Sequence, residues 1–207
     1  MTDPATPMRV LGVTGGIGAG KSAVAQILAE RGARVFDADR TVRELYAGGE
    51  LPRRIARRFG SAVMARDGSV DRPALAEVIF ANAAARADLE SMVHPEVRRR
   101  AAAWLAELAE ERFAGIAVID AALLVEATPP YPLDALLVVT APEELRLARL
   151  EARGVPRAEA RRRVAAQTSD EARLARADVV VVNDGPLEDL ASRVQAALRE
   201  LGWDEAP

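Results

Sequence analysis

The sequence has 207 residues, of which 50% are hydrophobic and 29% are charged, so it can form one or two compact domains with a buried core. Its net charge of −3 gives no basic field of the kind that predicts a nucleic-acid partner. The absence of cysteine excludes disulfides, thiolate metal sites and a cysteine nucleophile. No apolar run is long enough to span a bilayer and the amino terminus is not a signal peptide, so we expect a cytoplasmic protein with no membrane partner.

Short apolar runs alternate with helix-forming segments along most of the chain. Runs rich in Val, Ile and Leu predict buried strands at residues 9–14, 33–39, 115–120, 134–142 and 177–184. Helical spacing, bounded by Gly or Pro, predicts helices at 21–31, 142–153, 156–167 and 186–201. This alternation predicts an α/β fold, a doubly wound, five-stranded parallel sheet with helices on both faces.

Residues 40–114 interrupt this alternation. They are rich in Ala, Arg, Glu and Leu, with turns predicted at "AGGELP", "FGSA", "RDGSVDRP" and "VHP". We therefore expect a helical insert at 40–114 and a nucleotide-binding core formed by 8–39 and 115–201. Residues 1–7 and 202–207 are predicted to be tails.

The motif "GGIGAGKS", residues 15–22, joins the first predicted strand to the first predicted helix and fits the pattern G-x-x-x-x-G-K-[ST]. Its glycines let successive backbone N–H groups face phosphate oxygens, beside the positive end of the following helix. Lys21, the only lysine in the chain, can reach the β- and γ-phosphates, and the Ser22 hydroxyl can ligate Mg²⁺. The predicted ATP contacts are Gly15, Gly16, Ile17, Gly18, Ala19, Gly20, Lys21, Ser22 and Ala23.

A phosphate-binding loop occurs in several classes of protein. A GTPase switch reads guanine with Asn-Lys-x-Asp, which this chain cannot form because it has no second lysine. A small kinase fits the short sheet, the helical insert and an arginine-bearing lid. Another small-molecule or nucleoside kinase and a non-enzymatic ATP-binding switch remain as alternatives.

Polar residues follow the predicted strands at the edge where ligands bind in open α/β sheets. They are Asp37, Asp39, Asp120, Glu126 and Asn183. Asp37 and Asp39 are two apart, so on an extended chain both would point to the same side. One could accept a proton from an acceptor hydroxyl while the other orients it or binds Mg²⁺ through water. The alternative is that one of them caps the next helix.

Further candidates lie later in the chain. Asp120 has the position of a strand-end carboxylate that binds Mg²⁺ through water. The alternative is that it caps a helix or forms a salt bridge at the end of the strand. Arg149 and Arg153 share a helix face and can close on the transferring phosphoryl group, unless they belong to a solvated basic stripe. Asn183 would lie near the adenine of ATP, unless the Asn-Asp-Gly triplet is only a turn.

Several segments in order resemble the dephospho-CoA kinase family over about residues 8–201. They are "GVTGGIGAGKSAVA", "VFDAD", "FGSAVMARDGSVDRPALAEVIF", "LESMVHPEV", "ALLVEA", "LRLARLEARG" and "AAQ" followed by "ADVVVVNDG". The resemblance implies transfer of the ATP γ-phosphate to the 3′-hydroxyl of dephospho-CoA, the last step of coenzyme A synthesis, with Mg²⁺ and with no obligate protein partner.

The resemblance also implies roles for individual residues. Catalysis falls to Asp39 as the base with Lys21, Asp37 and Arg149, and the lid spans about 146–170. The acceptor-binding residues implied are Asp39, Arg72, His94 and Glu126. Two positions depart from the family pattern, since Ala122 replaces a usual proline and Arg146 replaces a usual glutamine.

Overall fold

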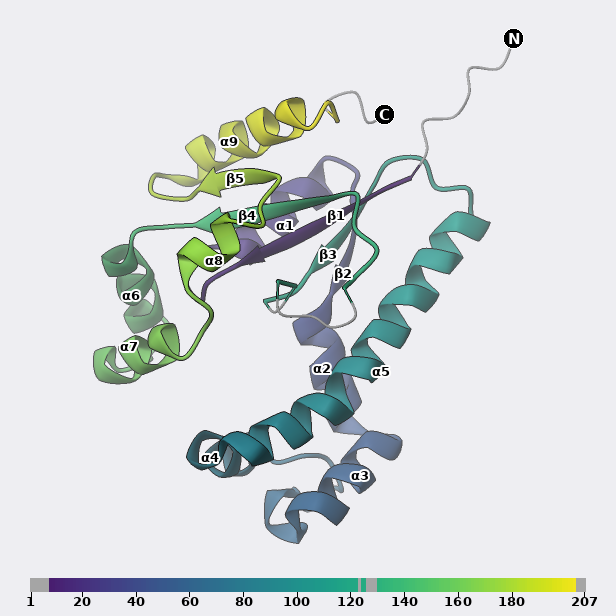
Figure 1. Cartoon of the computed structure of the whole chain (residues 1–207), viewed down its shortest axis with the longest axis vertical. Coiled ribbons are helices and arrows are strands. Elements are labelled where there is room, and N and C mark those ends of the chain that lie inside the picture. The colour runs from purple at the N-terminus through teal and green to yellow at the C-terminus, as the bar shows by residue number, and fades with distance from the viewer. Residues whose placement is uncertain (1–7, 123, 126–129, 204–207) are drawn as a thin grey trace. The chain divides into compact units, whose positions relative to one another are not determined.

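The computed structural model describes residues 8–122, 124–125 and 130–203 (Figure 1). Its sheet has the strand order β2-β3-β1-β4-β5, and each described pairing is parallel. The strands are β1 (Arg9–Gly15), β2 (Arg34–Asp37), β3 (Ile116–Asp120), β4 (Ala135–Thr140) and β5 (Val179–Val182). The predicted α/β fold with a five-stranded sheet is confirmed.

The strand order places the 15–22 loop where a ligand is expected. β1 lies between β3 and β4, and the chain passes from β1 to β2 on one side but enters β4 on the other. Strand order therefore reverses beside β1. In open α/β sheets ligands bind beyond the carboxyl ends of the strands at such a reversal, and the loop begins where β1 ends.

The described residues form two compact units. The first contains those up to Phe36 and from Glu107 onward, and the second is Asp37–Ala106. In the first unit, α1 (Lys21–Glu30) and α9 (Leu187–Glu200) share one apolar core with the sheet. Its fully enclosed members include Leu11, Val13, Val24, Val118, Leu137 and Val194. This core holds β1 and α1, which are the two ends of the loop, in fixed positions.

Three helices follow β4 in the first unit, and the first two of them share a second, smaller apolar cluster. They are α6 (Glu143–Ala152), α7 (Arg157–Ala165) and α8 (Asp170–Leu174). Leu147, Leu150 and Ala160 are buried between α6 and α7, and Ile17 of the loop packs against them. The sequence did not predict α8, because five residues are too few to show a helical period.

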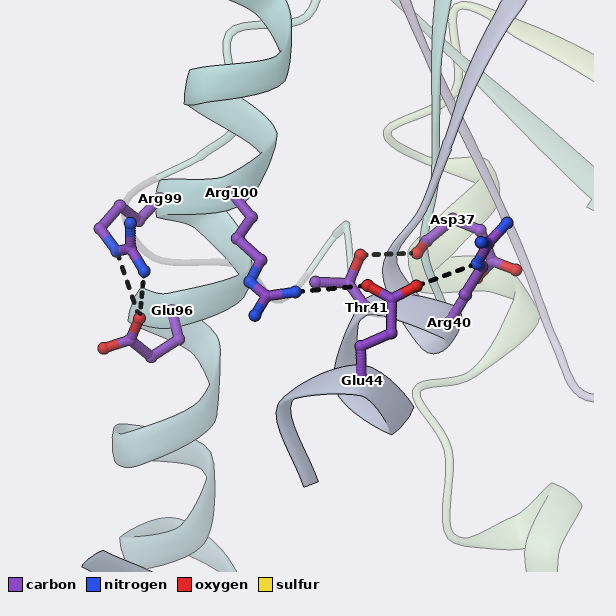
Figure 2. Close-up of polar contacts among 7 residues, drawn as sticks. All are labelled: Asp37, Arg40, Thr41, Glu44, Glu96, Arg99 and Arg100. Carbon is purple, nitrogen blue, oxygen red and sulfur yellow. Dashed lines mark hydrogen bonds and ion pairs between the residues drawn. The ribbon is translucent and has the colours of Figure 1, made fainter. Parts of the chain in front are cut away.

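The second unit is helical. It contains α2 (Ala38–Ala47), α3 (Glu50–Phe59), α4 (Arg72–Ala81) and most of α5 (Ala83–Glu110). Ion pairs tie its helices together: Arg100 with Glu44 at 3.3 Å, and Arg54 with Glu96 at 3.7 Å. Figure 2 shows the first of these pairs joining α5 to α2. Among the described residues, no helix has both the length and the apolar character needed to cross a membrane.

Two local predictions are wrong. The turn expected at "VHP" is absent, because Pro95 lies inside α5. Its missing N–H removes one helical hydrogen bond, but the buried positions Val93 and Val97 continue the apolar face across it. The second strand ends at Asp37 rather than at 39, since the Asp37 carboxylate accepts the Arg40 N–H at 2.7 Å and starts α2.

Leu137 offers a test of the core that holds the loop. Its side chain is fully buried in β4, so Leu137→Ala should lower the free energy of unfolding by about 2–5 kcal/mol. Leu187→Ala is the matched control, since Leu187 is 62% exposed and its truncation should cost less than about 0.5 kcal/mol. Urea unfolding measures both. Equal losses for the two variants would contradict this description of the core.

Candidate nucleotide-binding and catalytic site

The loop between β1 and α1 has a backbone that requires glycine. Gly18 and Gly20 have φ angles of 79° and 105°, in the left-handed region. Gly20 is the N-cap of α1, and its carbonyl accepts the Ala23 N–H at 3.0 Å. The loop therefore ends on the first turn of a helix, whose positive end attracts anions.

Two loop glycines also make room for neighbouring side chains. A Cβ atom on Gly20 would lie 2.1 Å from Asn183 Nδ2, and one on Gly16 would lie 2.3 Å from Arg146 Nη2. Such distances are impossible, so these side chains reach the backbone only because glycine is there. The motif thus allows both the bend of the loop and its contact with distant residues.

Lys21 and Asp120 form an ion pair. Lys21 Nζ lies 2.9 Å from Asp120 Oδ1, and both side chains are largely buried. Lys21 is the first residue of α1, and Asp120 is the last residue of the neighbouring strand β3. The structure therefore brings together two of the predicted site residues and fixes the ammonium beside the loop.

Arg149 and Asn183 converge on the carbonyl groups of the loop. Arg149 Nη1 donates to the carbonyls of Gly18 at 3.2 Å and Ala19 at 3.3 Å, and its Nη2 donates to both Asn183 oxygens at 3.1 Å. Asn183 Nδ2 in turn donates to the Ala19 carbonyl at 2.8 Å. Both side chains were predicted to face ATP, and in this structure they contact the loop itself.

Arg149 keeps its positive charge although it is partly buried against the loop. Burial, and secondly the nearby charge of Arg153, lower the pKa of Arg149. A guanidinium nevertheless keeps its proton in proteins, so Arg149 remains a cation against the loop. Arg153 is exposed at the end of α6.

Three polar residues that contact the loop or its partners were not predicted in this role. Gln167 accepts the Ile17 N–H at 2.7 Å, and Arg146 donates to the Ile17 carbonyl at 2.9 Å. Asp170 pairs with Arg146 at 2.7 Å. The sequence held a signal for two of them, since Gln167 ends the "AAQ" segment and Arg146 stands where the family usually has glutamine.

The aspartate pair does not have the predicted geometry. Asp37 caps α2, its carbonyl accepts the Thr41 hydroxyl at 2.9 Å, and Arg43 lies 3.6 Å from its carboxylate (Figure 2 shows Asp37 and Thr41). Asp39 is exposed in the first turn of α2, not on a strand. The expectation that both project from an extended chain on one side is therefore wrong, because the capping of α2 by Asp37 starts the helix between them.

The second unit carries the other acceptor-side candidates. Arg72 is exposed at the first position of α4, and His94 is half-buried in the middle of α5. Burial lowers the pKa of His94, and the charges of Arg98 and Arg86 act in the same direction against that of Glu90. The imidazole is thus mostly neutral at pH 7, which suits binding more than proton donation. Glu126 lies outside the described residues.

The part of the chain that the structure describes contains no metal site made by protein side chains alone. Within 8–122, 124–125 and 130–203, no group of three or more His, Asp or Glu residues could hold a metal ion. Ser22 is exposed at the second position of α1. A Mg²⁺ ion that arrives with nucleotide phosphates needs only one or two protein ligands, so the Ser22 hydroxyl fits such a role.

A family model and curated relatives identify one protein family, and solved structures share the fold. The sequence model of the dephospho-CoA kinase family matches residues 9–189. A dephospho-CoA kinase from Frankia casuarinae is 45% identical over 94% of this chain and 84% of its own length. A crystal structure from Thermus thermophilus is 37% identical, with a TM-score of 0.77 over 95% of this chain and 98% of that one. A dephospho-CoA kinase from Campylobacter jejuni, 22% identical with a TM-score of 0.61 over 94% of this chain and 97% of its own, shares the fold.

Gly20→Ala should damage the loop more than an alanine at another left-handed glycine. Both Gly20 and Gly154 have positive φ, so alanine at either costs about 1–2 kcal/mol of backbone strain. Only at Gly20 does the new methyl group collide with Asn183, since nothing lies within 4 Å of a Cβ at Gly154. Calorimetric titration should show ATP binding at least about ten-fold weaker in Gly20→Ala.

Gly154→Ala should bind ATP like the wild type while losing a few degrees in Tm. Similar ATP affinities for the two variants would contradict the close approach of Asn183 to the loop.

Proposed function

The chain belongs to the dephospho-CoA kinase family, and on that premise we propose that it transfers the γ-phosphate of ATP to the 3′-hydroxyl of dephospho-CoA. The family resemblance seen in the sequence is thereby confirmed, as is the assignment to P-loop kinases. The observation that carries the proposal is the glycine loop at the reversal point of the sheet, with Lys21 paired to Asp120 beside it.

The loop and Lys21 would bind the phosphates of ATP. The N–H groups of the loop and the amino end of α1 supply fixed positive dipoles, and Lys21 adds a compact charge that can reach the β- and γ-phosphates. Asp120 holds the ammonium in place through its 2.9 Å ion pair. Because phosphoryl transfer needs positioning and charge neutralisation above all, these groups supply most of what the donor side requires.

A Mg²⁺ ion bound with ATP would neutralise the β- and γ-oxygens, with Ser22 as a protein ligand and Asp37 or Asp120 reached through water. Arg149 already lies against the loop carbonyls and could neutralise charge on the transferring group. Asn183, and Arg153 at the end of α6, belong to the same proposed ATP site.

The acceptor side rests on the second unit. We propose Asp39 as the base that takes the proton from the 3′-hydroxyl. The hydroxyl oxygen then forms a bond to the γ-phosphorus, while the bond between that phosphorus and the β–γ bridging oxygen breaks and ADP leaves. Arg72 and His94 are proposed acceptor-binding residues, as is Glu126. The exposed side chains Phe80 and Val78 on α4 offer apolar surface that suits a long acceptor arm.

The cytoplasm is the proposed location, because ATP is a cytoplasmic metabolite. No nucleic-acid, membrane or obligate protein partner is part of the proposal. Another small-molecule kinase and an ATP-binding switch remain the alternatives to the proposed function. A different kinase would prefer another acceptor, and a switch would release no ADP in response to any acceptor.

The substrate prediction is tested with dephospho-CoA, adenosine and AMP side by side. Binding energy from a remote arm can align the 3′-hydroxyl, so adenosine should lose kcat as well as affinity. We expect kcat/KM for dephospho-CoA to exceed that for either short acceptor by at least about 10²-fold, or about 2.7 kcal/mol. Product NMR should place the phosphate on the ribose 3′ position. Equal efficiency with adenosine, or release of ADP that no acceptor increases, would refute the assignment.

Asp39→Asn tests the proposed base. The amide keeps the shape of the carboxylate but cannot accept the proton, so kcat should fall by about 10²–10⁴-fold while KM for ATP changes little. Asp37→Asn is the comparison variant and should lose less kcat than Asp39→Asn, because Asp37 caps α2 and the amide oxygen of asparagine can still accept the Arg40 N–H. A wild-type kcat in Asp39→Asn, or a larger loss in Asp37→Asn, would remove Asp39 from this role.

A further inference from the structure

The peptide groups on both sides of Ile17 are held by side chains from the α6–α8 segment, residues 143–174. The Ile17 N–H donates to Gln167 Oε1 at 2.7 Å, and the Ile17 carbonyl accepts from Arg146 Nε at 2.9 Å. Its side chain packs against Leu147 and Leu150. The third residue of the motif is therefore fixed through its donor, its acceptor and its apolar side chain.

Arg146 reaches the loop as a buried cation. Its side chain is 4% exposed, and its Nη2 lies where only a glycine at position 16 leaves room. Its Nη1 pairs with Asp170 at 2.7 Å. A planar guanidinium can make these two contacts at once, because its nitrogen donors diverge in fixed directions.

A single carboxylate serves two buried guanidinium groups here. Asp170 also pairs with Arg173 Nη1 at 3.2 Å, and Arg173 is 1% exposed. Among the residues that the structure describes, the Nε and Nη2 atoms of Arg173 have no hydrogen-bond partner. Two positive charges and one negative charge leave this cluster with a net charge of +1, in contact with the loop, and such a charge favours phosphate binding.

We infer that Arg146 and Gln167 are positioning residues for phosphate binding. They hold the peptide groups of Ile17, so that the N–H groups that follow it keep the orientation that phosphate needs. The Ile17 N–H itself is engaged by Gln167, and it therefore does not belong to the phosphate-binding set, although the motif alone places Ile17 there. The inference rests on the proposed function only in taking phosphate as the ligand of the loop.

Arg146 replaces the glutamine usual in the family, and the contacts suggest what the exchange adds. A glutamine at 146 could still donate one hydrogen bond to the Ile17 carbonyl. It could not bring a charge to the loop or form an ion pair with Asp170. Arg146→Gln should therefore retain the orientation of Ile17 but lose the electrostatic contribution.

The experiment measures phosphate binding apart from catalysis. Tripolyphosphate carries the phosphates of ATP without the nucleoside, and its affinity for the full-length protein is measured by calorimetric titration. Gln167→Met and Arg146→Met should each weaken tripolyphosphate binding and raise KM for ATP by about ten-fold, while KM for dephospho-CoA stays within about two-fold. Arg146→Gln should lie between Arg146→Met and the wild type.

Two matched controls make the same substitutions away from the loop. Arg157 pairs with Glu144 and Glu151 in the α6–α8 segment, and Gln26 bonds Glu30 on α1. Arg157→Met and Gln26→Met should bind tripolyphosphate like the wild type. Lys21→Ala is the positive control and should abolish measurable binding.

The half-buried position of Gln167 keeps the inference falsifiable if Arg146→Met fails to fold. A folded Gln167→Met with wild-type tripolyphosphate affinity would overturn it. So would equal increases in KM for ATP and for dephospho-CoA, which indicate a merely structural role. Because tripolyphosphate binding needs no acceptor, the result stands even if dephospho-CoA proves not to be the substrate.

Discussion

The fixing of the loop carbonyls is the interaction on which the rest of the site depends. Arg146, Arg149 and Asn183 engage the carbonyl oxygens of Ile17, Gly18 and Ala19 from outside the motif. In a peptide group the N–H points away from the C=O, so holding the carbonyls in place also orients the amides. A loop held in this way presents its positive dipoles to an anion at no further cost in ordering.

The chain uses its two kinds of basic residue for different tasks at this site. Arg149 donates to four oxygen atoms because its guanidinium spreads donors over a plane. Lys21 forms an ion pair with Asp120, and its compact ammonium sits at the start of α1. Holding several backbone carbonyls in place favours the guanidinium of arginine, which has several donors. Reaching between phosphates favours the compact ammonium of lysine. A single lysine in a chain otherwise supplied with arginine is consistent with this division.

Local sequence patterns predicted the sheet and the loop, but they did not predict contacts between residues far apart in the sequence. β1 and β4 were recognised because strands buried on both faces become continuous apolar runs. The loop was recognised because its backbone requires glycine at fixed spacing. The contacts of Arg146 and Gln167 with Ile17 span more than a hundred residues, and no local pattern encodes them. The helical start at Asp37 was only the alternative interpretation of the sequence, because capping and strand extension compete for the same aspartate.

The cluster of Arg146, Asp170 and Arg173 contains two buried guanidinium groups, which are costly for stability and are better explained by ligand binding. Two of the nitrogen atoms of Arg173 lack hydrogen-bond partners in the described part of the chain, and burying such groups disfavours folding. Apolar side chains of similar size could fill this space with less loss of solvation. They could not hold the Ile17 carbonyl or leave a positive charge beside the loop. A phosphate ligand would gain from both features, so anion binding would offset part of this cost in folding free energy. The arrangement thus belongs to those buried charges that favour a bound state over the most stable unbound one.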